Sequence, residues 1–263
     1  MEMATSADGT AIAYDRIGSG PALILLPGAT CTRGILASLA ETLSAHFTVF
    51  AVDRRGRGDS DDMAAPPPYA VEREVEDVEA LVAAAGGSAA LYGHSSGAAL
   101  ALHATAAEIG VTRLVMHDAP YSTPSMEQAA RDWHVHLHET LADDRPGDAV
   151  AAFMQKVGLP EQAITGMRNG PGWPAMEAVG SSLAYDSAAM GDAIGGVVPR
   201  DLASRVSVPT LVLVGGADLE FMLDAADQLV AALPDGRLEH LVGARHDAGP
   251  EVVVPGMLPF LLA

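Results

Sequence analysis

The chain has 263 residues, 49% of them hydrophobic, a length that suits one large α/β domain with a well-buried core. Lysine and arginine number 15 against 34 aspartate and glutamate residues, which gives a formal net charge of -19 at pH 7. Such a charge repels nucleic acid and anionic membranes and argues against polyphosphate ligands. We therefore expect a small-molecule substrate and no nucleic-acid or membrane partner.

Cysteine usage and the N-terminal residues bear on the cellular compartment. The single cysteine, Cys31, excludes an intramolecular disulfide and a cysteine-based zinc site. Residues 1–10 are polar, and no run reaches about 18 uninterrupted apolar residues. We expect neither secretion nor a membrane span, and therefore a cytoplasmic location. The sequence does not indicate an oligomeric state.

Strand and helix patterns alternate through the first 120 residues, which is typical of α/β architecture. Apolar runs of strand length predict buried strands, and apolar residues at helical spacing predict helices. A glycine-rich polar loop at 53–60 and a stiff proline run at 66–68 separate two of these elements. We predict strands at 10–16, 22–26, 47–52, 89–92 and 113–117, and helices at 35–43, 71–85 and 96–109.

The alternation then stops for about eighty residues. Helical patterns follow at 126–141, 149–157 and 176–183, with many prolines and glycines and no convincing strand. We interpret residues 121–200 as an inserted helical cap.

The alternation resumes after the cap, with strands expected at 208–215 and 237–242 and helices at 221–233 and 251–262. The predicted core therefore consists of two pieces of chain, residues 1–120 and 201–263. No linker of the kind that separates independent domains interrupts either piece.

A Gly-x-Ser-x-Gly pentad centred on Ser95 joins the strand at 89–92 to the helix at 96–109. A strand, a sharp turn with this pattern and a helix are typical of a nucleophile elbow. The serine of such a turn has a strained backbone, and the flanking glycines stand where a Cβ would collide. We predict that Ser95 is a nucleophile and not simply the N-cap of the helix.

A serine hydroxyl at its ordinary pKa is a poor nucleophile, so Ser95 needs a histidine as base and an acid that orients that histidine. Both partners are expected at the ends of later strands. Asp218 follows the strand at 208–215, and His246 follows the strand at 237–242. The resulting order of serine, aspartate and histidine is the order expected after a nucleophile elbow.

These motifs resemble the α/β-hydrolase fold superfamily over nearly the whole chain, in its serine hydrolase branch with a helical cap. The resemblance implies a mostly parallel eight-stranded sheet with helices on both faces, an inserted cap, and no cofactor or metal. The matching pieces are Pro27-Gly28-Ala29, the loop from Asp53 to Ser60, Gly93-His94-Ser95-Ser96-Gly97, Val208-Pro209-Thr210-Leu211, Gly215-Gly216-Ala217-Asp218 and Gly243-Ala244-Arg245-His246.

The resemblance also implies an oxyanion hole made of the backbone N–H groups of Ala29 and Ser96. Some members of the fold carry the acid after the sixth strand, which makes Asp118 the alternative to Asp218. We favour Asp218, because Gly-x-x-Asp after the seventh strand is the commoner arrangement. Pro27 stands where the family commonly has a histidine, and so removes a side chain that often braces the hole.

Other motifs receive structural interpretations. His134 and His138 share a helix face, but no glutamate lies between them as in a His-Glu-x-x-His zinc site, so we expect polar cap residues and no metal. The run Arg54-Arg55-Gly56-Arg57 resembles a phosphate patch, but the family loop accounts for it. We expect His94, His117 and Cys31 to pack beside the site and His136 to face away from its neighbours.

The sequence therefore predicts a cofactor-independent serine hydrolase that acts on a small, fairly apolar ester, lactone or related carbonyl compound. A serine at position 95 disfavours the dehalogenase and epoxide-hydrolase branches of the fold, which attack through a carboxylate. Two alternatives stay open: a C–C bond hydrolase or perhydrolase, and a non-hydrolytic or ligand-binding protein on the same scaffold.

Overall fold

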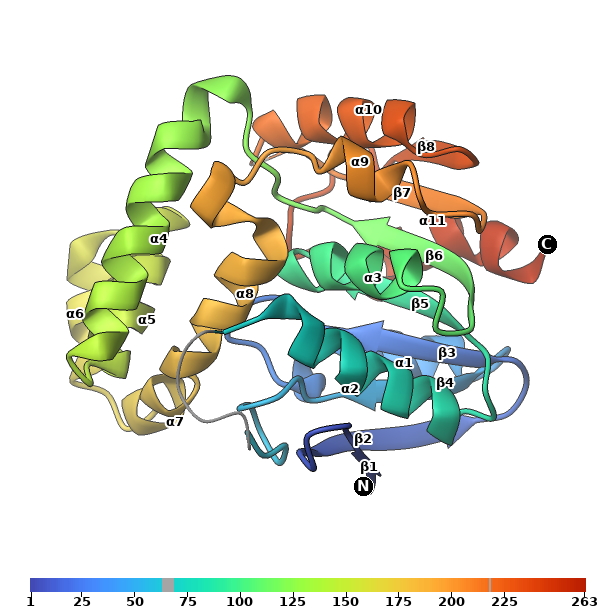
Figure 1. The fold of residues 1–263 in the computed structure, drawn as a ribbon, viewed down its shortest axis with the longest axis horizontal. Helices are drawn as coiled ribbons and strands as arrows, with labels where there is room; N and C mark the ends of the chain where they lie inside the picture. Colours follow the sequence, from blue (N-terminus) through green and yellow to red (C-terminus); the bar gives the residue numbers. More distant parts are fainter. Residues whose placement is uncertain (63–68, 218) are drawn as a thin grey trace.

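The computed structural model describes residues 1–62, 69–217 and 219–263 (Figure 1). At its centre is an eight-stranded sheet with the strand order β1-β2-β4-β3-β5-β6-β7-β8. The strands are β1 Glu2–Thr5, β2 Ala11–Gly18, β3 Ala22–Leu26, β4 Thr48–Val52, β5 Ala89–His94, β6 Val111–His117, β7 Thr210–Val214 and β8 Gly236–His240.

Strands β1 and β2 pair antiparallel, as do β2 and β4, and every other neighbouring pair is parallel. The predicted mostly parallel eight-stranded sheet is confirmed. Strand β1 was not predicted from the sequence, and it lies within the polar residues 1–10. It has four residues, of which only Ala4 is buried, so its sequence carries almost no strand signal.

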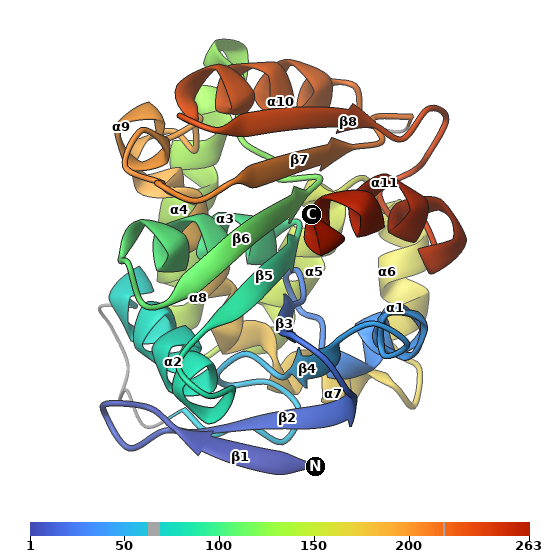
Figure 2. The same ribbon diagram turned by 90° about the vertical axis from the view of Figure 1, so that its right-hand side faces the viewer.

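Helices cover both faces of the sheet, as Figure 2 shows. One apolar layer lies between the sheet and α2, α3 and α10, and the opposite layer lies between the sheet and α1 and α11. In β5, Leu91 belongs to the first layer and Tyr92 to the second, because successive side chains of a strand point to opposite faces. These helices are α1 Ala37–Leu43, α2 Val71–Ala84, α3 Ser96–Ala106, α10 Phe221–Ala232 and α11 Pro250–Leu262, and the 3-10 turn η1 Arg33–Leu36 precedes α1.

Between β6 and β7 the chain forms helices that have a small apolar core of their own, with Leu137, Val150 and Trp173 at its centre. Figure 1 places α4 to α7 to one side of the sheet. That these helices act as a cap stays a prediction. They are η2 Pro124–Met126, α4 Glu127–Ala142, α5 Pro146–Lys156, α6 Glu161–Arg168, α7 Trp173–Ala178, η3 Gly180–Ser182, α8 Leu183–Met190, η4 Asp192–Ile194 and α9 Arg200–Ala203.

The helical segment differs from the sequence prediction at two places. The single helix predicted at 176–183 is wrong, because α7 ends at Ala178 and α8 begins at Leu183. A Cβ built on Gly180, between the two, would lie 2.4 Å from the carbonyl oxygen of Pro146, so the chain passes close to the start of α5 there. Helix α6 was not predicted at all.

Two predicted features, the proline run at 66–68 and Asp218, lie outside the described residues. Among the residues that the structure describes, no helix is long and apolar enough to cross a membrane.

The turn between β5 and α3 is crowded by backbone. A Cβ built on Gly97 would lie 2.3 Å from the carbonyl oxygen of Leu26 and 2.6 Å from that of Pro27. A Cβ built on Gly93 would lie 2.3 Å from the carbonyl oxygen of Gly97. Carbon and oxygen atoms that are not bonded do not approach this closely, so α3 reaches its place against β3 only with glycine at both positions.

We expect Gly97→Ala to lower the free energy of unfolding by about 2 kcal/mol or more, because the methyl group forces α3 away from β3. Urea unfolding of the purified variant measures this change. Gly166→Ala in α6 is the matched control: its built Cβ meets nothing within 4 Å. That control should gain about 0.5–1 kcal/mol, as alanine does in helices. A Gly97→Ala variant as stable as the wild type would contradict the packing argument.

Candidate active site

Ser95 occupies the turn between β5 and α3 with φ 57° and ψ -126°, a conformation that non-glycine residues rarely adopt. Its side chain makes no capping hydrogen bond to α3, so helix capping does not explain the serine. Its backbone N–H donates to the carbonyl of His117 at 2.9 Å. A Cβ built on Gly28 would lie 2.9 Å from Cβ of Ser95, so the loop after β3 runs directly beside the serine.

His246 meets a buried carboxylate. Its Nδ1 lies 3.2 Å from Oδ2 of Asp118, which is at the end of β6 and whose side chain is 0% exposed. Oδ1 of the same carboxylate accepts the backbone N–H of Gly215 at 2.9 Å. The His246 side chain is 26% exposed. An imidazole held through Nδ1 in this way has a fixed ring orientation.

Asp118 is ionised in this setting. Burial by itself would raise the pKa of this carboxyl. The hydrogen bond from His246, the nearby His117 and the N–H of Gly215 outweigh that effect and hold the pKa below its ordinary value. The backbone of Asp118 has a positive φ of 48°. Its N–H donates to the carbonyl of Leu213 at 2.9 Å, which stabilises this conformation.

Three imidazoles stack beside the elbow. The ring centroid of His94 lies 4.5 Å from that of His246 and 5.0 Å from that of His117. Nε2 of His94 donates to the carbonyl of His246 at 2.9 Å, so the residue before Ser95 holds the loop that carries His246. The Tyr92 hydroxyl and Nδ1 of His117 form a hydrogen bond at 2.7 Å. Because a carbonyl oxygen only accepts, His94 carries its hydrogen on Nε2.

Two of these imidazoles are neutral. Burial, with the neighbouring His117 and His246, lowers the pKa of His94 to about 3. Burial also lowers the pKa of His117 to about 4, although the Asp118 carboxylate acts in the opposite direction. Neither ring therefore adds positive charge beside the Asp118 and His246 pair at neutral pH.

The structure describes a hydrogen bond between the predicted histidine and the alternative acid. Ser95 lies on a neighbouring turn, where its N–H donates to the carbonyl of His117, the residue before Asp118. The Ala29 and Ser96 peptide groups, the expected oxyanion donors, adjoin Gly28 and Ser95. Asp218, the favoured acid, lies outside the described residues, so its assignment stays a prediction. Asp118 is the acid whose contact with His246 is described.

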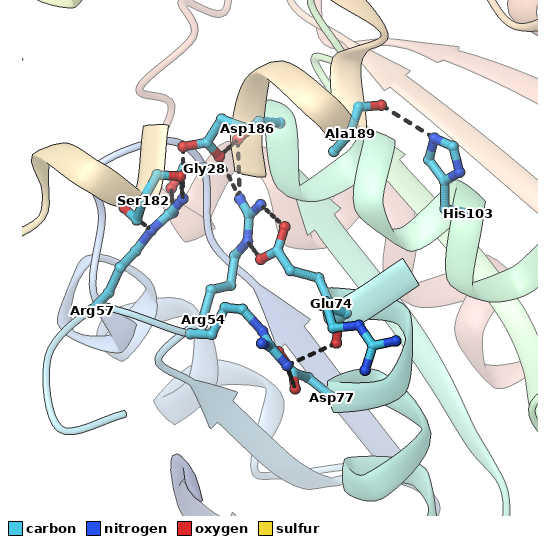
Figure 3. A network of polar contacts seen from close by, with 12 residues as sticks. Gly28, Arg54, Arg57, Glu74, Asp77, His103, Ser182, Asp186 and Ala189 are labelled. Atoms are coloured by element: carbon cyan, nitrogen blue, oxygen red, sulfur yellow. Dashed lines mark hydrogen bonds and ion pairs between the residues drawn. The ribbon is translucent and has the colours of Figure 1, made fainter. Parts of the chain in front are cut away.

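The arginine run of the loop after β4 is buried and not an exposed phosphate patch. Figure 3 shows Arg54 between Glu74 of α2 and Asp186 of α8. Its Nε and Nη2 each lie 2.7 Å from a Glu74 oxygen, and its Nη1 lies 2.7 Å from Oδ1 of Asp186. Arg57 donates from Nη2 to Oδ2 of Asp186 at 2.6 Å. Arg55 pairs separately, with Asp77 of α2.

Sequence reasoning missed the acidic partners of these arginines. A weak signal existed for Glu74, because it shares the apolar face of α2 with Val78 and Leu81 at helical spacing. No such signal existed for Asp186, because α8 is buried on nearly all sides. Burial would raise the pKa of Asp186, but Arg57 and Arg54 keep it below its ordinary value, so the carboxylate stays charged.

The remaining candidates from the sequence are His134, His138 and Cys31. The rings of His134 and His138 lie 4.3 Å apart on α4, and Nδ1 of His134 lies 3.2 Å from Oγ of Ser187. Within the described ranges, no group of three histidine, cysteine, aspartate or glutamate side chains is arranged to hold a metal. Cys31 is half-buried, and burial raises the pKa of its thiol.

The model of the alpha/beta hydrolase family matches residues 23–255. An alpha/beta hydrolase from Sphaerobacter thermophilus has a similar crystal structure, with 42% sequence identity, a TM-score of 0.84, and coverage of 98% of this chain and 99% of that chain.

Two curated relatives are similar over part of their length. N-formylmaleamate deformylase of Pseudomonas putida is 35% identical over 153 residues, which are 56% of this chain and 57% of that protein. Pimeloyl-[acyl-carrier protein] methyl ester esterase of Xanthomonas campestris pv. campestris is 38% identical over 119 residues, 45% of this chain and 43% of that protein. The matched part of the chain thus spans about half the length of these relatives.

The buried neutral histidines make stability depend on pH. The unfolded chain protonates His94 and His117 below their ordinary pKa of 6.5, whereas the folded chain does so only near pH 3 and pH 4. The unfolded state therefore binds more protons in this window, and the free energy of unfolding falls as the pH drops from 6.5 to 4.

We expect His117→Gln to flatten this slope by about 1.4 kcal/mol per pH unit, the contribution of one proton. Urea unfolding at pH 7, 6, 5 and 4.5 measures the slope. His46→Gln, at an exposed histidine, is the control and should leave the slope as it is. Equal slopes in His117→Gln and wild type would show that His117 is not buried in its neutral form.

Proposed function

Because the chain belongs to the alpha/beta hydrolase family, we propose that it is a serine hydrolase that transfers an acyl group from a small carbonyl substrate to water. The observation that carries this proposal is the buried Asp118 carboxylate on Nδ1 of His246, beside the strained turn of Ser95. The two curated relatives, a deformylase and a methyl ester esterase, support cleavage of a bond to a carbonyl carbon.

In the proposed first step, Oγ of Ser95 attacks the substrate carbonyl and Nε2 of His246 takes the hydroxyl proton. Collapse of the tetrahedral intermediate breaks the bond to the leaving group, which receives that proton. Water then attacks the acyl-enzyme and gives a proton to His246. The bond between the acyl carbon and Oγ of Ser95 breaks, Oγ takes this proton back from His246, and the acid product leaves. Asp118 orients the imidazole and stabilises its charged form throughout.

The proposed oxyanion hole uses the backbone N–H groups of Ala29 and Ser96. Support comes from the contact of Gly28 with Ser95, and from the place of Ser96 as the first residue of α3. The N-terminus of α3 adds a favourable dipole for the developing negative charge. Loss of one such donor typically costs about 2.7–4 kcal/mol of transition-state stabilisation.

We propose Asp118, and no longer Asp218, as the acid of the triad. The described hydrogen bond from His246 and the second hydrogen bond from Gly215 favour it. The chain order of serine, aspartate and histidine is unchanged by this choice.

The proposed substrate is a small ester, lactone or related carbonyl compound without a large negative charge, because the net charge of -19 offers no attraction to anions. We propose that α4 to α8 act as the cap over the site. Support for this comes from α8, which contacts α3 and whose Asp186 accepts a hydrogen bond from the Ser96 hydroxyl.

The nucleophile is tested with a panel of p-nitrophenyl esters and aliphatic lactones of graded chain length. We expect turnover of the shorter esters by the wild type and a loss of at least about 10⁴-fold in Ser95→Ala. A fluorophosphonate probe should label the wild type at Ser95 and leave Ser95→Ala unlabelled. A folded wild type that takes no label would refute the hydrolase proposal and favour a ligand-binding role on this scaffold.

The acid is tested by Asp118→Asn beside its matched control, Asp218→Asn. We expect kcat to fall about 10⁴-fold in Asp118→Asn, because an amide stabilises the wrong tautomer of the histidine, and to stay within about threefold of wild type in the control. Steady-state hydrolysis of the best p-nitrophenyl ester measures both. The reverse pattern would return the acid role to Asp218.

A further inference from the structure

We propose that Asp186 on α8 is a positioning residue that, through Arg54 and Arg57, fixes both backbone donors of the oxyanion hole from behind. This inference rests on the proposed function. The geometry of the oxyanion hole then depends on the position of α8, a helix that begins more than sixty residues after the end of β6.

The first donor is fixed through a shared peptide plane. Nη1 of Arg57 donates to the carbonyl oxygen of Gly28 at 2.8 Å. The carbonyl of Gly28 and the N–H of Ala29 belong to one planar peptide group and point in opposite directions. A charged donor on the oxygen therefore sets the direction of the Ala29 N–H and polarises it, which makes it a stronger donor to an oxyanion.

The second donor is fixed through the side chain of its own residue. The hydroxyl of Ser96 donates to Oδ1 of Asp186 at 2.7 Å and accepts from Nη1 of Arg54 at 3.1 Å. The same Nη1 lies 3.3 Å from the carbonyl oxygen of Pro27. Arg54 thus joins the start of α3, which carries the Ser96 N–H, to the end of β3.

The Asp186 carboxylate binds both arginines and so fixes their positions relative to each other. Its Oδ1 accepts from Arg54 and its Oδ2 accepts from Arg57, at 2.7 and 2.6 Å (Figure 3). All three side chains are buried. With Glu74, two positive and two negative charges cancel, so removal of the Asp186 charge leaves a buried guanidinium without its compensating carboxylate.

This arrangement compensates for Pro27, which stands where the family commonly has a histidine. A proline has no side-chain donor, yet its carbonyl and that of Gly28 are both held by guanidinium groups from the loop after β4. The arginines supply the bracing that a histidine side chain at position 27 would otherwise give. The two arginines lie three residues apart in this loop, and both bind the carboxylate of Asp186 on α8.

Asp186→Asn is the main test, with the protein assayed on its best p-nitrophenyl ester. We expect kcat to fall about 10- to 100-fold, less than the loss for a deleted oxyanion donor, while KM changes less than about threefold. The inhibition constant of a trifluoromethyl ketone analogue, whose adduct oxygen occupies the hole, should rise by the same factor as kcat falls. A residue that only stabilises the fold would not move this constant.

Asp77→Asn is the matched control. Asp77 forms a buried pair with Arg55 of the same loop, at 2.7 and 2.6 Å, and Arg55 donates to Asp8 and to the carbonyl of Arg73. The control has the same chemical change in an equally buried carboxylate, but the hydrogen bonds described for its partner Arg55 go to neither the Pro27 nor the Gly28 carbonyl. We expect its kcat and its ketone inhibition constant to stay within about twofold of wild type.

Two milder variants cover the case in which Asp186→Asn does not fold. Ser96→Ala removes the hydroxyl that joins Asp186 and Arg54, and Arg57→Lys keeps the charge but offers one nitrogen in place of three. Each should lower kcat by about 3- to 30-fold and weaken ketone binding by the same factor. Circular dichroism and thermal melting establish that the compared variants are folded.

The inference is overturned if folded Asp186→Asn, or both milder variants, match Asp77→Asn in kcat and in ketone inhibition. A rise in KM alone would assign Asp186 to substrate binding and would also overturn it. Failure of the proposed function gives a different result: the folded wild type would take no fluorophosphonate label at Ser95.

Discussion

The strained turn at Ser95 is the constraint on which the site depends. It is possible only because Gly93 and Gly97 let α3 approach β5 and β3 without a Cβ between backbones. That approach brings the loop after β3 against the serine, and it places His94 where its ring can stack on His246. The close backbone contacts at Gly93 and Gly97 therefore determine both the packing of α3 on the sheet and the position of the proposed nucleophile.

The buried titratable side chains around this turn form two groups, neutral histidines and ion-paired arginines. On one side, His94 and His117 are held neutral by burial, so the Asp118 carboxylate acts on His246 without competing positive charge. On the other side, buried arginines form ion pairs with carboxylates. Burying such pairs seldom adds net stability over apolar packing, because desolvation offsets the attraction. Their geometric value, as donors to the carbonyls beside the serine, gives a physical reason for their presence.

The sequence predicted the central part of the fold well and its periphery poorly. Apolar runs such as 22–26 were predicted correctly because a parallel strand is buried on both faces. Strand β1 was missed because one buried residue in four leaves no pattern. The break between α7 and α8 was missed because it depends on the approach of Pro146 to Gly180, which no local periodicity records.

The sequence by itself determined the α/β architecture, the elbow around Ser95 and a histidine after the last strand, since each is written in a short continuous pattern. Only the tertiary structure decided which described carboxylate meets His246, and that Asp186 joins two arginines more than a hundred residues away. The reason is physical. A hydrogen bond between residues 128 positions apart depends on where two strand ends meet, and an acidic residue has the same local sequence whether it faces solvent or a buried guanidinium.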